Sequence, residues 1–158
     1  MIQQTMITNR TQFDVDRYAE LKAKGWQNMS DAEKAEWSQP LKGCYNYTDM
    51  NRVESAVEFV AARLRCLGYS VPTLTVKTDW NKQDIPTRED IGRYYGNVAI
   101  LREIIGIGNA TPQAPTIYDR LTHSRANDLE QILVNIDSSL DRLIESWYYV
   151  GELYAGEV

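Results

Sequence analysis

The chain has 158 residues, of which 43% are hydrophobic and 25% charged, a balance typical of one folded globular body with a sizeable core. No stretch approaches the roughly 20 consecutive apolar residues that cross a bilayer, so we expect no membrane partner. The formal net charge of −5, with basic residues scattered among acidic ones, argues against nucleic acid as a partner.

Residues 1–10 lack the basic start and apolar run of a signal peptide, so we expect synthesis and assembly in the cytoplasm. The chain has two cysteines, too few for a disulfide scaffold. We expect Cys44 and Cys66 to be free thiols, with Cys66 buried beside an apolar stripe.

Two short helices are predicted near the N-terminus. Thr11 with Asp14, and then Ser30 with Glu33, have the spacing of a helix N-cap and an acidic third position. Pro40 ends the second helix. These helices form an N-terminal arm.

A third helix is predicted from its cap at Thr48 to Gly68. Its apolar stripe recurs at alternating spacings of three and four: Met50, Val53, Val57, Val60, Leu64 and Leu67. The segment from Tyr69 to Trp80 is rich in β-branched residues and interrupted by Pro72, so it predicts an extended connector or one short edge strand.

A fourth helix is predicted from Thr87 to Gly106, and the linker that follows is rich in glycine and proline. Its stripe consists of Ile91, Tyr94, Val98, Leu101 and Ile105.

The last helix is predicted over roughly Ser124 to Tyr149. Its stripe has a seven-residue repeat: Leu129, Leu133, Ile136, Leu140, Leu143 and Trp147. A repeat of 3.5 residues per turn favours left-handed winding of packed helices. We expect the stripe to pack inside the chain's own core, with a seam shared between chains as the alternative.

The predicted fold is therefore all-α, a bundle of three long helices with a short N-terminal helical arm and one extended connector. The arm covers residues 1–40 and the bundle domain residues 41–158, and we expect them to form one compact unit.

Residues for catalysis or metal binding are scarce. His123 is the only histidine, which excludes a two-histidine zinc site within one chain, and we interpret it as a surface residue at a helix start. The run from Asp79 to Asp90 spaces oxygen ligands like a calcium loop but lacks its glycine, so Asp79 and Asp84 are interpreted as turn and capping residues. We therefore predict no catalytic, cofactor or metal residues.

Aromatic residues gather at the C-terminus: Trp147, Tyr148, Tyr149 and Tyr154. Consecutive aromatic side chains cannot all face one core from one helix, so some are expected to point outward, as at interfaces and sugar-stacking sites. Trp80 is added to this predicted interaction set. The alternative is that these rings cap the end of the bundle.

Three stretches resemble a module found in tail and baseplate proteins of phages and prophages of Gram-positive bacteria. Residues 42–54, KGCYNYTDMNRVE, are close to a KGAYNxTDLNRVE pattern. The other two stretches are KTDW with DIPT at residues 77–80 and 84–87, and LT, ANDLE and NID at residues 121–122, 126–130 and 135–137.

This resemblance implies a structural protein in the virion tail, assembled in the host cytoplasm, and brings no catalytic residues with it. The first stretch contains a fold signature: Asn46, Thr48, Asp49, Asn51, Arg52 and Glu54. We expect Arg52 and Glu54 to fix the loop before the third helix by hydrogen bonds.

The sequence thus leads us to expect a non-enzymatic tail, baseplate or tail-fibre-associated component that binds other phage tail proteins and its own copies. Three alternatives remain open. They are a receptor-binding module for cell-wall glycan, a head-decorating protein, and a wall hydrolase using Glu145 or Glu152.

Overall fold

The computed structural model describes residues 2, 5–106, 108 and 110–154, with side chains as far as Trp147. Its elements are α1 (Gln12–Lys24), the 3-10 helix η1 (Trp26–Asn28), α2 (Asp31–Trp37), α3 (Tyr47–Cys66), α4 (Arg88–Ile105) and α5 (His123–Tyr154). No strand occurs in this part of the chain, so the predicted all-α class is confirmed.

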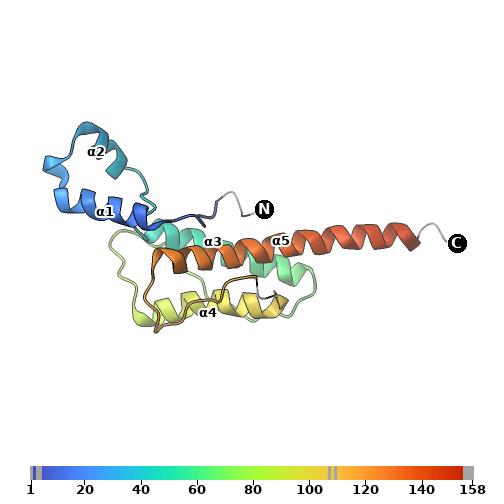
Figure 1. Cartoon of the computed structure of the whole chain (residues 1–158). Coiled ribbons are helices and arrows are strands. Elements are labelled where there is room, and N and C mark those ends of the chain that lie inside the picture. The colour runs from blue at the N-terminus through green and yellow to red at the C-terminus, as the bar shows by residue number, and fades with distance from the viewer. Residues whose placement is uncertain (1, 3–4, 107, 109, 155–158) are drawn as a thin grey trace.

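The long helices α3, α4 and α5 pack on one another as a bundle, as predicted, while α1 and α2 stand off beyond one end of it (Figure 1). At the other end α5 continues well past the neighbouring helices (Figure 1).

The starts of α1 and α2 follow the predicted capping chemistry, and α4 begins in the same way. Reciprocal capping boxes, in which each partner accepts the other's backbone N–H, begin α1, α2 and α4: Thr11 with Asp14, Ser30 with Glu33, and Thr87 with Asp90. The predicted cap of α3 was wrong, because Asn46, and not Thr48, holds that position. Asn46 is extended and its side-chain oxygen accepts the N–H of Thr48, while Asp49 accepts the N–H of Asn46 at 2.9 Å.

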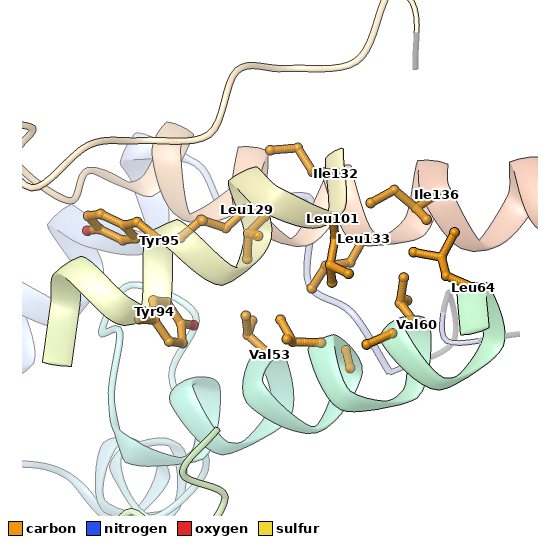
Figure 2. Packing of buried hydrophobic residues seen from close by; sticks show 14 of the residues in the cluster. Val53, Val60, Leu64, Tyr94, Tyr95, Leu101, Leu129, Ile132, Leu133 and Ile136 are labelled. Atoms are coloured by element: carbon orange, nitrogen blue, oxygen red, sulfur yellow. The ribbon is translucent and has the colours of Figure 1, made fainter. Parts of the chain in front are cut away.

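The core lies between α3, α4 and α5 (Figure 2). Figure 2 shows side chains from all three helices meeting there: Val53, Val60 and Leu64 from α3; Tyr94, Tyr95 and Leu101 from α4; Leu129, Ile132, Leu133 and Ile136 from α5. Tyr94 shares a hydrogen bond with the hydroxyl of Tyr45, and burial raises the pKa of both phenols well above the usual range.

Two sequence expectations outside the core stripes have different outcomes. The segment from Tyr69 to Trp80 is an irregular extended connector without a strand. Cys66 is exposed and not buried as predicted. It lies two positions after the buried Leu64, and residues two apart on a helix do not share a face.

The turn before α3 packs tightly against the start of α1. A Cβ at Gly43 would lie 1.9 Å from the backbone oxygen of Asp14, far inside contact distance. We predict that Gly43→Ala destabilises the chain by about 1–3 kcal/mol, because backbone must move to admit the methyl group. Gly96→Ala, inside α4 with open space around it, is the matched control and is expected to stabilise by about 0.5–1 kcal/mol. Urea unfolding followed by tryptophan fluorescence measures both, and equal effects would contradict the tight contact.

Glu33 makes the stability of the N-terminal arm depend on pH. Hydrogen bonds from Lys24, and then from the Ser30 backbone, lower its pKa from 4.5 to about 2. A carboxylate whose pKa is lowered by folding stabilises the fold above its unfolded pKa, and this contribution is lost as the pH falls through the folded value. We predict that Glu33→Gln lowers the Tm at pH 6, and that the difference from wild type disappears as the pH falls from about 4.5 to about 2. A difference that stays constant over this range would contradict the assignment.

Candidate functional site

The segment before α1 lies along α5 and is held there by side chains on one face of that helix (Figure 1). Three side chains of α5 accept its backbone N–H groups: Asp137 that of Ile2 at 2.9 Å, Glu130 that of Ile7 at 2.6 Å, and Asn127 that of Arg10 at 3.0 Å. The N–H groups of extended backbone outside a sheet have no backbone partners, so these side chains accept the hydrogen bonds that water would otherwise accept. The described residues of this segment are therefore fixed to the bundle of the same chain.

Four charged side chains meet in the interior, where the segment before α1 contacts α3 and α5. Arg10 donates to Asp49 at 2.9 Å and to Glu130 at 2.7 Å, and Arg52 contacts the same two carboxylates. The side chains of Arg10 and Glu130 are 2% and 0% exposed. Two cations facing two anions make the cluster neutral, which is the condition for burying charge at tolerable cost. We call these four residues the Arg10 cluster; it joins the N-terminal segment, α3 and α5.

A second buried carboxylate, Glu54 on α3, holds the connector and α4. Both terminal nitrogens of Arg93 donate to it at 2.8 Å, and the backbone N–H of Lys77 donates at 3.0 Å. The hydrogen bonds from Arg93 to Glu54 raise the pKa of Arg93 above its usual range. The expectation that Glu54 fixes the loop before α3 was wrong, because its position faces the connector and α4.

Trp80 belongs to the fold and not to an exposed interaction surface as predicted. Asn51 accepts its backbone N–H at 2.8 Å and donates to its carbonyl at 2.9 Å. Trp80 is 4% exposed, its indole N–H points to Glu54 at 3.4 Å, and the Lys77 ammonium lies over the ring, 4.7 Å from its centroid. A ring so enclosed cannot stack on a sugar.

The apolar stripe of α5 leaves the bundle near Leu140, its last member in the core. Arg63 of α3 reaches this level, where it pairs with Asp137 and, at 2.7 Å, with Asp141. Beyond it α5 runs on alone (Figure 1). There Leu143 is partly buried and Trp147 is 51% exposed, so neither joins the core.

The predicted interaction residues are thus separated. Trp147 lies on the projecting part of α5, whereas Trp80 lies inside the bundle. The side chains of Tyr148, Tyr149 and Tyr154 lie outside the described residues, as does Glu152 of the hydrolase alternative.

A pocket of about 340 Å³ lies where the start of α1, the turn before α3 and the start of α5 meet. His123, the first residue of α5, is partly buried in its wall beside Lys42 and Arg120. Within the described residues no group of three or more His, Cys, Asp or Glu side chains is placed to hold a metal ion, and no helix has the length and apolarity to cross a membrane.

Comparison of the chain with protein-family models, with curated proteins and with solved structures finds no match.

Sequence reasoning missed Arg10 and the roles of Asn127, Glu130 and Asp137. The three α5 residues lie three and seven positions apart, a spacing that places them on one helix face beside the apolar stripe. That spacing was a usable signal for a polar contact surface. Nothing local to Arg10 indicates that it is buried.

We predict that Glu130→Ala destabilises the chain by about 3–5 kcal/mol, because it leaves two arginines in the interior facing one carboxylate. Glu36→Ala breaks the exposed pair with Arg17 and is the matched control, with a much smaller effect expected. Urea midpoints compare the two variants. Similar midpoints would contradict a stabilising role for the Arg10 cluster.

Proposed function

We propose that this chain is a non-enzymatic structural protein of a phage virion, a tail or baseplate component that acts through protein–protein contacts, including contacts with its own copies. The observation that carries the proposal is the apolar stripe of α5, which continues with the same spacing past the end of the bundle. Its outer members, Leu143 and Trp147, lie outside the chain's core.

The partner that fits this stripe best is a second α5. A seven-residue repeat matches a helix that has the same repeat, because the side chains of each then fill the gaps of the other at a shallow crossing angle. The projecting part from Arg142 to Tyr154 is long enough, about 20 Å at 1.5 Å per residue, for nearly two such repeats. Repetition around a symmetric tail then adds many modest contacts into a strong assembly.

The resemblance to phage tail modules supports the same function. Its stretches supply most of the Arg10 cluster, with Asp49 and Arg52 from the first and Glu130 from the third. Glu54 and Trp80, from the first and second stretches, meet in the second network. Motif residues that bind one another inside the fold define a scaffold and not a catalytic centre. A head-decorating position is an alternative location for the same scaffold, and glycan binding is less well supported because Trp80 is buried.

Self-association is tested by light scattering of the purified chain across a dilution series. We expect a stable oligomer that Leu143→Asp with Trp147→Asp converts to a monomer, since a carboxylate in the seam is costly to bury. Bundle stability is expected to stay unchanged because both residues lie outside the core. Arg142→Asp, at an exposed position off the stripe, is the matched control and should remain oligomeric. A monomer at all concentrations, or an oligomer that the double variant preserves, would contradict assembly through α5.

The virion location is tested separately. Mass spectrometry of phage particles purified from the strain that encodes the chain should find it at a fixed copy number per particle. Immunogold labelling should place it on tails. Particles without the chain would contradict the proposed function even if the chain associates with itself.

A further inference from the structure

The three long helices of the bundle all run in the same direction. Near the start of α3, Arg52 contacts Glu130 at 2.8 Å. Near the end of α3, Arg63 contacts Asp141, which lies further along α5, at 2.7 Å. Figure 2 shows that α4 has the same direction, since the labelled residues of all three helices increase in number from one side of the view to the other. The three C-terminal ends therefore lie at one end of the bundle, and only α5 continues beyond it (Figure 1).

The apolar stripe of α5 faces the other two helices. Its members as far as Leu140 lie in the core between α3, α4 and α5. A stripe with a seven-residue repeat drifts around a straight α-helix by only about 20° per repeat, so Leu143 and Trp147 lie on the same side as Leu140. Beyond the end of the bundle, that side is the continuation of the space that α3 and α4 occupy (Figure 1). A partner helix on Leu143 and Trp147 must therefore lie in line with α3 and α4.

A second α5 in parallel orientation does not fit this space. Its projecting part would lie in line with α3 and α4 of the first chain, and the rest of the helix would then extend back through the volume that α3 and α4 fill. Close-packed helices leave no room for another. Sliding the copy along the helix gives no solution, because the stripe as far as Leu140 is covered by α3 and α4 of the same chain.

An antiparallel copy meets neither obstacle. Its α5 enters from the opposite direction, and its bundle lies beyond the C-terminal end of the first chain's α5. Each projecting part then lies in line with α3 and α4 of the other chain, and the two parts overlap over about 20 Å, the length that the bundle leaves uncovered. A two-fold axis passes near Tyr148, the middle of the part from Arg142 to Tyr154, so both chains contribute the same surface.

The charges of α5 do not oppose this orientation. In coiled coils, charged residues at the positions that flank the apolar stripe select the orientation of the partner. In the projecting part these positions have uncharged residues: Ile144, Ser146, Gly151 and Leu153. The sequence also continues the stripe itself, with Val150 and Tyr154 at the next spacings of three and four. The steric limit set by α3 and α4 therefore decides the orientation.

We infer that the chain forms a two-fold dimer in which the projecting parts of two α5 helices pack antiparallel. This inference rests on the self-association put forward as the proposed function and adds its geometry. Trp147, the large exposed side chain of the stripe, lies near the axis, offset by about 3 Å along it from Trp147 of the partner subunit. Two-fold pairing closes this surface after two copies, so the dimer and not the single chain is the unit that repeats in a larger assembly.

The test is pulsed electron paramagnetic resonance on the full chain with one spin label per chain. Cys44→Ser and Cys66→Ser remove the native thiols, and the label is attached at Arg142→Cys or at Ser124→Cys, both exposed positions of α5. In an antiparallel pair, the distance between labels grows by about 3 Å for each residue away from the axis, twice the helical rise. We expect the distance at position 124 to exceed that at position 142 by roughly 50 Å.

The same labels in the variant with Leu143→Asp and Trp147→Asp are the control and should give no intermolecular distance. Equal distances at the two labelled positions would overturn the antiparallel orientation and leave self-association intact. Light scattering of the same samples separates this result from a monomer, which would overturn the orientation together with the self-association on which it rests. A trimer as the smallest species would contradict a surface that closes after two copies.

Small-angle X-ray scattering tests the wild-type chain without labels or cysteine changes. The two bundles lie at opposite ends of an antiparallel dimer, so we expect its maximum dimension to exceed that of the monomeric double variant by at least about 25 Å. A parallel pair is no longer along α5 than one chain. A dimer without this increase in length would therefore rule the inference out.

Discussion

The Arg10 cluster is the constraint on which the rest of the structure depends. Arg10, Arg52, Asp49 and Glu130 are all largely removed from water, and such a set is tolerable only when every member is present. The cluster therefore acts as a single condition linking the N-terminal segment, α3 and α5. Apolar packing between the long helices tolerates small sliding movements, whereas hydrogen-bonded charges at 2.7–2.9 Å do not. The register of α3 against α5 thus follows from electrostatics as much as from the stripes.

The same cluster fixes the pocket. Arg10 immediately precedes the capping residue of α1, so holding Arg10 in the interior also holds the first turn of that helix. The turn at Gly43 then has backbone against backbone on α1, with no room for a side chain. Lys42 and the start of α5 are brought to one place as a consequence. Charged residues that are far apart in sequence meet in the pocket because a buried, neutral set of charges lies beneath them.

Sequence patterns predicted what depends on neighbours along the chain. The periodic stripes predicted α3, α4 and most of α5, and the capping pairs predicted the starts of α1 and α2. Errors arose where a contact distant in sequence decides the outcome. The sequence predicts Trp80 to be an interface aromatic residue, but Asn51, 29 residues earlier, holds its backbone inside the fold. Arg10 and Glu130 are 120 residues apart, and no local pattern links them.

The length of α5 explains why its apolar stripe extends beyond the core. It has 32 residues, against 20 in α3 and 18 in α4, so its stripe is longer than the surface its own chain provides. The part of the stripe beside α3 and α4 is covered within the chain, whereas beyond it Leu143 is only partly buried and Trp147 is 51% exposed. The expectation of core packing therefore holds for the stripe as far as Leu140, and the proposed seam between chains concerns only the part beyond it. A second copy offers the same surplus with the same repeat, which makes α5 itself the simplest partner for the uncovered residues.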